Sequence, residues 1–403
     1  MVGWRWLPVF CMACGICESA DWPQWRGIHR DGISPETGLL ESWPPGGPPL
    51  VWKTRGLGEG YSAFSIVDGR LYTQGQRGDQ EFVMAIDVNA GKTIWITQSG
   101  RAFREQRGNG PRGTPTIDGP RLYALSADGT LQCLEAASGK RLWGMNVVER
   151  FGGQVPPWGI SESPLVDGDR VIVTPGGSGA AVVALNKNDG AVLWKSQSDS
   201  AAYSSPMAFD AGGSRQLVVF TADAAIGLNI ATGEFQWRYQ KVSNRTANIA
   251  TPIIHDGHVF LSSDYGTGCA LLRLTPGGRT VTASEVYFNR DMRNHYSSSV
   301  LVGDYLYGFS SSVLTAMKFL TGAVAWRDRS VGKGSVTYAD RHLYALSEDG
   351  VAGLIEATPA GYKEKSRFEI SKGNFPTWTP PVIANGKLYL REQDNLYCYN
   401  IKR

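Results

Sequence analysis

The sequence has little cysteine, and this limits the ways in which the chain can be cross-linked. Only 6 of 403 residues are cysteine, and three of these lie within the first 17 residues. No Cys-x-x-Cys pair or Cys/His cluster occurs after residue 20, so a structural zinc site is not expected. The later cysteines are odd in number and far apart, which favours buried thiols over a disulfide framework. They are Cys133, Cys269 and Cys398.

The sequence also has little net charge and no long apolar run. The formal net charge is +3, and the basic residues are scattered, so no nucleic-acid partner is expected. The apolar stretch from Leu7 to Ile16 is shorter than the ~20 residues that a membrane-spanning helix needs. We therefore expect no transmembrane span.

The first 20 residues have the order of a secretory signal. Arg5 precedes the apolar stretch, and small residues end at Ser19 and Ala20. This predicts a signal peptide over residues 1–20 and a periplasmic or extracellular protein. Two alternatives remain open at this point. The early cysteines invite a lipid anchor, although none follows a convincing attachment pattern, and the segment is also compatible with a buried apolar helix.

The sequence is rich in glycine, with 49 residues. It also contains a repeat that has two parts. The first part begins at a small residue and proline, and an apolar residue follows seven positions later in seven copies. The eighth copy, which starts at Ser205-Pro206, carries an insertion through Gly212-Gly213. The apolar positions are Leu71, Leu122, Val171, Leu217, Val259, Leu306, Leu343 and Leu388.

The second part of the repeat is an apolar residue, a glycine-containing turn, and a tryptophan four residues after the glycine. Two copies lack the tryptophan and have Tyr287 or Phe368 instead. We interpret the indole rings as packing between neighbouring repeats rather than as ligand stacks. The tryptophans of the repeat, together with Trp52 before the first complete repeat, are Trp95, Trp143, Trp194, Trp237 and Trp326.

The spacing of the repeat predicts a β-propeller. Adjacent apolar positions lie between 37 residues (Leu306 to Leu343) and 51 residues (Leu71 to Leu122) apart. This is close to the ~40–50 residues of a four-stranded blade. Asp-Gly and Asn-Gly between apolar runs indicate tight hairpins, and so antiparallel strands. The prediction is an all-β, eight-bladed propeller with four-stranded antiparallel blades over residues 21–403.

The two ends of the repeat array indicate how the ring closes. The C-terminal repeat ends one strand short at Leu396–Tyr399, and residues 49–55 form a strand with no blade before it. We predict that Leu50–Thr54 completes the last blade. Residues 21–48 are irregular and rich in proline and glycine, and they are expected to wrap an outer surface.

The repeat best seen from Ala85 to Trp95 resembles that of pyrroloquinoline-quinone (PQQ)-like propellers. The opening Asp21–Gly27 is similar to a segment of bacterial secreted members. The resemblance implies one of two branches. Quinoprotein alcohol dehydrogenases hold PQQ and a calcium ion over the central channel, commonly under a disulfide of adjacent cysteines, which this chain lacks. The other branch is similar to the scaffold lipoprotein of the outer-membrane barrel-assembly machine, which binds proteins and no cofactor.

The repeat register also predicts where a ligand would bind. Propeller ligands usually lie where the inner strands begin, and the position three residues before the proline marks that mouth. It is rich in aromatic and basic residues, unlike the other columns of the repeat. The candidate ligand-binding residues there and beside it are Tyr61, Arg112, Glu162, Tyr203, Asn248, His295, Tyr296, Lys333 and Trp378.

Rings and cations at one mouth suit a small anionic ligand, a sugar or an acidic peptide. Glu162 and Asn248 carry the oxygen atoms that calcium prefers, but calcium needs six to eight of them. No catalytic residues are predicted, because no triad, phosphate loop or carboxylate pair is found. We expect a secreted, monomeric, non-catalytic binding or scaffold protein. The alternative is a PQQ-dependent dehydrogenase, with Ca²⁺, that oxidises an alcohol or sugar.

Overall fold

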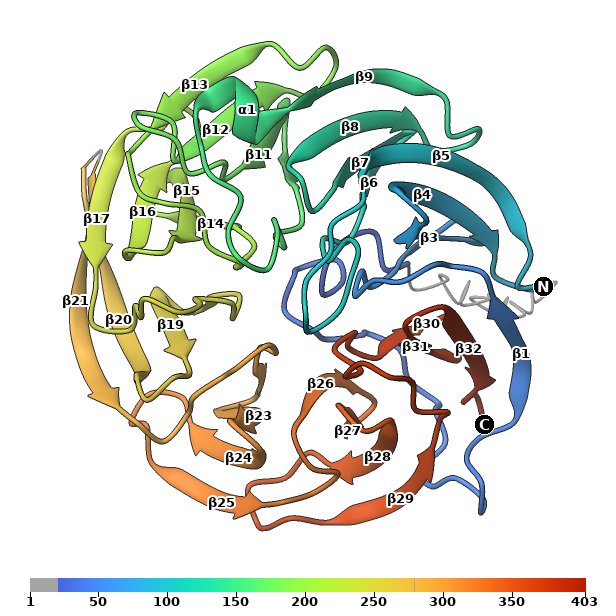
Figure 1. Ribbon diagram of the computed structural model, residues 1–403. Helices are drawn as coiled ribbons and strands as arrows, with labels where there is room; N and C mark the ends of the chain where they lie inside the picture. The colour runs from blue at the N-terminus through green and yellow to red at the C-terminus, as the bar shows by residue number, and fades with distance from the viewer. Residues whose placement is uncertain (1–20, 279) are drawn as a thin grey trace, which may run out of the picture.

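The computed structural model describes residues 21–278 and 280–403, and it confirms the eight-bladed propeller (Figure 1). Eight four-stranded antiparallel sheets surround a central channel. In the described part of the chain the one helix is α1, Val147–Phe151. No helix there has the length and hydrophobicity of a membrane span. The expected signal peptide, residues 1–20, lies outside the described residues.

Each blade runs from an innermost strand at the channel to an outermost strand at the rim. Blade 1 consists of β2 Ser65–Val67, β3 Arg70–Arg77, β4 Gln80–Asp87 and β5 Thr93–Arg101, and blade 2 of β6 Thr116–Asp118, β7 Arg121–Leu125, β8 Thr130–Glu135 and β9 Arg141–Asn146. Blade 3 consists of β10 Leu165–Asp167, β11 Arg170–Val173, β12 Val182–Asn186 and β13 Val192–Ser196. Blade 4 consists of β14 Met207–Ala211, β15 Ser214–Phe220, β16 Ala225–Asn229 and β17 Phe235–Tyr239.

Blades 5 to 8 follow the same order, except that the rim strand of blade 8 comes from the start of the chain. Blade 5 consists of β18 Ile253–His255, β19 His258–Ser263, β20 Gly268–Gly277 and β21 Thr280–Asn289, and blade 6 of β22 Val300–Val302, β23 Tyr305–Ser310, β24 Val313–Lys318 and β25 Val324–Asp328. Blade 7 consists of β26 Gly334–Ala339, β27 His342–Ser347, β28 Val351–Glu356 and β29 Glu364–Glu369. Blade 8 consists of β30 Val382–Ala384, β31 Lys387–Glu392, β32 Asn395–Asn400 and β1 Leu50–Arg55.

The tight turns between the two innermost strands explain the Asp-Gly and Asn-Gly pairs of the repeat. In blade 1, Asp68 and Gly69 have φ angles of 50° and 72°, and in blade 8 Asn385 and Gly386 have 59° and 67°. Two consecutive residues with positive φ match the right-handed twist of the flanking strands. Glycine, aspartate and asparagine tolerate this conformation at low cost.

The rim tryptophans join each blade to the next. The ring of Trp95 in blade 1 lies against Gly139 in blade 2, and its Nε1 donates a hydrogen bond to Ala136 O at 3.1 Å. A Cβ at Gly139 would lie 2.5 Å from that ring, so glycine is needed for the close approach. The rings that meet a glycine of the next blade in this way are Trp52, Trp95, Trp143 and Trp194.

Where the repeat lacks tryptophan, another ring takes its place. Tyr287 packs against Gly322 and donates its hydroxyl to Phe319 O at 2.8 Å. Phe368 in blade 7 packs on Gly47 and Trp43, which come from the N-terminal segment. Trp326 Nε1 donates a hydrogen bond to Thr358 O at 2.7 Å, as Trp95 does to Ala136 O.

Trp237 is the exception among the rim tryptophans. Its Nε1 is buried and has no hydrogen-bond partner among the described residues. The next blade is blade 5, where β20 and β21 form nine residue pairs, from Cys269 opposite Asn289 to Gly277 opposite Thr280. This long hairpin replaces the short glycine turn that the other rings contact.

The ring closes as the sequence predicts. Strand β1 pairs antiparallel with β32, with Trp52 opposite Cys398 and Thr54 opposite Leu396. Arg391 of blade 8 is fully buried and donates to Ser62 O at 2.9 Å and Gln74 O at 2.7 Å in blade 1. The last blade is therefore joined to the first through both its rim strand and its core.

The N-terminal segment corrects one expectation, because residues 22–34 cross the channel instead of wrapping an outer surface. Trp22 forms a bridge with Ile66 in blade 1, and Ile33 forms one with Tyr338 in blade 7. The blue chain that follows residue 20 passes near the centre of Figure 1. Backbone carbonyls facing the channel need hydrogen-bond donors, and this segment supplies them.

Two buried arginines do most of this pairing. Arg26 Nη2 donates to Ser299 O at 2.6 Å, and Arg30 Nη2 donates to Ser163 O at 2.9 Å. Burial lowers the pKa of Arg26 to about 10 and that of Arg30 to about 9. Only the later part of the segment, around Trp43, covers the outside of blade 7.

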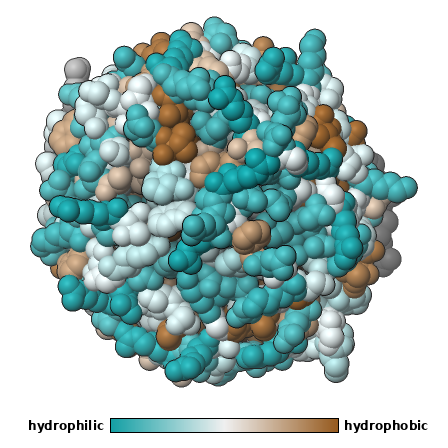
Figure 2. Space-filling model, in the orientation of Figure 1, coloured by the Kyte–Doolittle hydropathy of each residue, from teal (hydrophilic) through white to brown (hydrophobic). Residues whose placement is uncertain are grey.

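The surface contains no broad apolar area on the face that Figure 2 shows. Hydrophobic residues appear there as small, separate brown patches within a mostly hydrophilic surface. Isolated apolar side chains of this kind are normal for a folded protein and do not indicate a large interface.

Candidate functional site

A cavity of about 470 Å³ lies at one mouth of the channel. The loops that lead into the innermost strands supply most of its lining, because all of these strands begin at the same end of the channel. Seven of the nine predicted residues line it together: Tyr61, Arg112, Tyr203, His295, Tyr296, Lys333 and Trp378.

One wall of the cavity is a series of three rings. The centroid of Tyr61 lies 4.8 Å from that of Trp378, and the centroid of Trp378 lies 5.7 Å from that of Tyr296. The interplanar angles are 34° and 31°. These spacings are in the range in which aromatic pairs attract one another, so the rings hold each other in place.

Two further ring pairs complete the lining, one across the cavity at Tyr203 and one beside Tyr296. Trp158 packs against Tyr203 at a centroid distance of 5.6 Å, and Tyr265 packs against His295 at 5.1 Å. Burial raises the pKa of Tyr203 to about 12, so its hydroxyl stays protonated at neutral pH. Burial, aided by Lys333, lowers the pKa of His295, which keeps that imidazole neutral.

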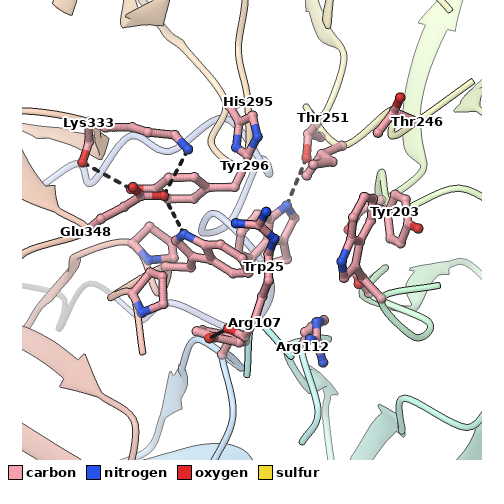
Figure 3. A pocket seen from close by; sticks show the side chains of 18 of the residues that line it. Trp25, Arg107, Arg112, Tyr203, Thr246, Thr251, His295, Tyr296, Lys333 and Glu348 are labelled. Carbon is pink, nitrogen blue, oxygen red and sulfur yellow. Dashed lines mark hydrogen bonds and ion pairs between the residues drawn. The ribbon is translucent and has the colours of Figure 1, made fainter. Parts of the chain in front are cut away.

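The floor is Trp25, which the N-terminal segment carries across the channel. Its Nε1 donates a hydrogen bond to the hydroxyl of Thr251 in blade 5 at 2.9 Å. Figure 3 shows Trp25 in the middle of the lining residues. The cavity is thus closed from below by a fixed indole ring.

The cationic side chains of the lining differ in whether they form ion pairs with protein carboxylates. Arg112 Nη2 lies 3.0 Å from Glu105 Oε1, and its guanidinium lies over the ring of Tyr61. Lys333 Nζ lies 3.0 Å from Glu348 Oε1. Arg107, at the bottom of Figure 3, has no hydrogen bond or ion pair from its guanidinium to any described residue and is exposed at the mouth.

Glu348 is the one carboxylate in the lining that the described residues form. Besides the ion pair with Lys333, its Oε1 accepts a hydrogen bond from Trp378 Nε1 at 2.6 Å. The carboxylate is therefore committed to fixing the aromatic wall. Both contacts are made by Oε1.

The structure corrects the expected position of Glu162 and Asn248, which do not line the cavity. Both side chains turn into the blades, where their exposed fractions are 1% each. Glu162 accepts hydrogen bonds from the backbone N–H and the hydroxyl of Thr174 at 2.6 and 2.5 Å. Burial raises the pKa of Glu162 to about 7. Asn248 accepts from Asn244 N at 3.1 Å.

These residues do not fit the calcium ion that the dehydrogenase branch of the resemblance implies. The two candidate ligands bond to the protein itself, and neither faces the cavity. Within residues 21–278 and 280–403, no group of three or more His, Cys, Asp or Glu side chains is arranged to hold a metal. A calcium shell of six to eight oxygens cannot be assembled from the lining.

Several lining residues were not predicted from the sequence. Trp25 lies in a segment without a repeat, so no register indicated it. Tyr265 and Glu348 lie in the β19–β20 and β27–β28 hairpins, which return to the same mouth because the strands are antiparallel. Trp158, three residues before Ser161, could have been found by extending the repeat column upstream.

The comparisons with known proteins agree with this architecture. A family model described as "Outer membrane protein assembly factor BamB" matches residues 78–328. The protein of that name from Salmonella typhimurium is 28% identical over 202 residues, which are 49% of this chain and 46% of the relative. A quinoprotein ethanol dehydrogenase from Pseudomonas aeruginosa is 31% identical over 111 residues, 27% of this chain and 17% of the relative. The chain thus aligns with less than half the length of each.

Solved structures show the same fold at low sequence identity. BamB from Moraxella catarrhalis superposes with a TM-score of 0.64 and 16% identity, over 88% of this chain and 98% of that structure. A europium-containing methanol dehydrogenase gives a TM-score of 0.68 and 12% identity, over 94% and 90%. A protein named as an assembly factor and a dehydrogenase share this fold, so function must be argued from the site.

Proposed function

Since this chain belongs to the family described as outer membrane protein assembly factor BamB, we propose that it is a non-catalytic binding protein. It holds a segment of a partner protein at the channel mouth. The proposal places it in the periplasm or at the inner side of the outer membrane, as the name of its relatives suggests. The partner and the location rest on relatives that the chain matches only in part.

The observation that carries the proposal is the state of the cavity carboxylate. Glu348 Oε1 is held by Lys333 at 3.0 Å and by Trp378 at 2.6 Å. Oxidation of an alcohol requires a group that removes the hydroxyl proton as hydride leaves. Glu348 is the one carboxylate in the lining that the described residues form, and its Oε1 holds a ring and a cation in place, so the cavity is better suited to binding than to proton transfer.

Cross-linking tests the proposal directly. A photo-reactive amino acid would replace Tyr265, which is 44% exposed at the mouth, in cells that export the protein. The matched control replaces Leu320, which is 53% exposed in the turn between β24 and β25 and does not line the cavity. We expect protein adducts from position 265 and not from position 320.

Adducts from the control position alone, or from neither, would contradict the proposal. The purified protein would also be mixed with PQQ, calcium and an electron-accepting dye over a panel of alcohols and sugars. We expect no reduction of the dye. Turnover that saturates with substrate would overturn the non-catalytic assignment, whatever the cross-linking shows.

A further inference from the structure

We propose that the mouth cavity recognises an aromatic side chain and a neighbouring carboxylate on one peptide segment. This inference rests on the proposed function and specifies the chemistry that the partner presents. The rings of the cavity bind the aromatic side chain, and Arg107 binds the carboxylate.

Aromatic rings line the cavity on several sides. Tyr61, Trp378 and Tyr296 form one wall, Trp158 and Tyr203 lie on another side, and Trp25 forms the floor. A ring inserted from the mouth can therefore contact aromatic faces or edges on several sides. Each such pair adds to the free energy of simple burial.

The charge of the site favours an anion. Three cationic side chains, of Arg107, Arg112 and Lys333, line the cavity. Two of them are ion-paired, with Glu105 and Glu348 respectively, which leaves one positive charge from Arg107. A guanidinium matches a carboxylate with two parallel N–H···O hydrogen bonds, so the free group is suited to this ligand.

A carboxylate ligand also matches the charged donors of the lining. It only accepts hydrogen bonds, and the guanidinium of Arg107 offers donors that no described residue takes up. Sugar hydroxyls are neutral and do not use this positive charge. The free charge therefore favours a carboxylate over a neutral sugar.

The size of the cavity limits the ligand to a short segment. About 470 Å³ is within the ~300–1,000 Å³ typical of sites for small ligands. It admits one large side chain and its neighbours but no folded element. We therefore expect the partner to insert the tip of a loop or an unfolded segment.

The test measures fluorescence polarisation of dye-labelled peptides with the full chain. The parent peptide is Gly-Ser-Asp-Phe-Ser-Gly, and two comparison peptides replace its Asp by Asn or its Phe by Ala. We expect Kd to rise about tenfold for each change, because Asn lacks the charge that strengthens hydrogen bonds from Arg107 and Ala lacks the ring that contacts the aromatic lining. Arg107→Ala should weaken the parent peptide by a similar factor and remove the preference for Asp over Asn.

Arg104→Ala is the matched control. Arg104 lies in the same loop, but its guanidinium pairs with Asp79 at 2.8 Å and does not line the cavity. This variant should bind all three peptides as the unchanged protein does. Both side chains are exposed, so neither substitution should disturb folding, and thermal unfolding checks this.

Four results would overturn the inference. Equal affinity for the Asp and Asn peptides would remove the role of charge, and unchanged binding by Arg107→Ala would remove the role of that residue. Equal affinity for free 3-phenylpropionate would identify a small acid instead of a peptide. If no peptide binds while position 265 still cross-links to a protein, the ligand chemistry is wrong and the proposed function stands.

Discussion

The indole N–H of Trp378 donates to Glu348 Oε1 at 2.6 Å, which fixes the ring at the centre of the aromatic wall. The same oxygen lies 3.0 Å from Lys333 Nζ. Glu348 therefore both orients a ring and neutralises a cation. These two roles can be separated, because glutamine keeps the oxygen that accepts from Trp378 and loses the charge.

Glu348→Gln should make the cavity bind acidic peptides more tightly. The substitution leaves the Lys333 charge uncompensated, and at partly exposed sites one such charge changes affinity by roughly severalfold at low salt. The measurement is the polarisation titration at two salt concentrations. Tightening that fades at high salt supports this account, and weaker binding at both concentrations contradicts it.

Gly139→Ala should destabilise the fold more than Gly119→Ala does. Both glycines have positive φ, 73° and 54°, so both changes cost about 1 kcal/mol of backbone strain. At Gly139 the new methyl also meets the Trp95 ring at 2.5 Å, whereas at Gly119 nothing lies within 4 Å. We expect an extra cost of about 2 kcal/mol from that overlap, measured by urea unfolding. Equal costs would mean that the rim contact contributes little.

The sequence was informative about the blades because each blade solves the same packing problem. Within a blade the ring follows its glycine by four residues, as Trp95 follows Gly91, and most of these rings meet the glycine turn of the next blade. Features that occur once leave no such pattern. Trp25 forms the cavity floor from a segment without repeats, and only tertiary contacts such as the hydrogen bond to Thr251 place it there.

The direction of each side chain at the mouth also could not be predicted from the sequence. Ser161 and Glu162 are neighbours in one loop, yet Ser161 lines the cavity and Glu162 turns into the blade to bond Thr174. The repeat register identifies the loop and not the direction of each side chain within it. Residue type was misleading here, because an acidic residue near a channel resembles a metal ligand.

Removal of the closing strand should abolish cooperative unfolding. Deleting residues 48–55 removes β1 and leaves the edge of β32 unpaired, together with the Trp52 contact to Gly91 in blade 1. Circular dichroism during urea unfolding should show a broad transition at much lower urea concentration. Leu50→Ser is the control, since that side chain is 53% exposed. A single sharp transition at the original midpoint would refute closure by β1.

The stability of the protein should fall as pH rises through the neutral range. Burial raises the pKa of Glu81 to about 8, so the folded state keeps a proton that the unfolded chain loses near its ordinary value of 4.5. The stabilisation is complete below about pH 4.5 and is lost as pH rises toward 8. Burial also raises the pKa of Glu162 to about 7, so this carboxyl likewise lowers the stability of the fold as pH rises.

Glu81→Gln should reduce this slope, because glutamine has no proton to lose. The measurement is the urea midpoint at about pH 5, 6.5 and 8 for both proteins. The difference between them should shrink or reverse as pH rises. An identical pH dependence would show that the Glu81 carboxyl is not kept protonated by the fold.

The central claim is that the partner binds at the channel mouth, between the rings that Trp25 and Trp378 provide. Hydrogen–deuterium exchange, measured with and without the partner recovered by cross-linking, tests it most directly. The account predicts slower exchange in the mouth loops around Tyr61, Arg107 and Tyr296, with the rim strands unchanged. Slower exchange confined to the rim strands, such as β5 and β9, would contradict it.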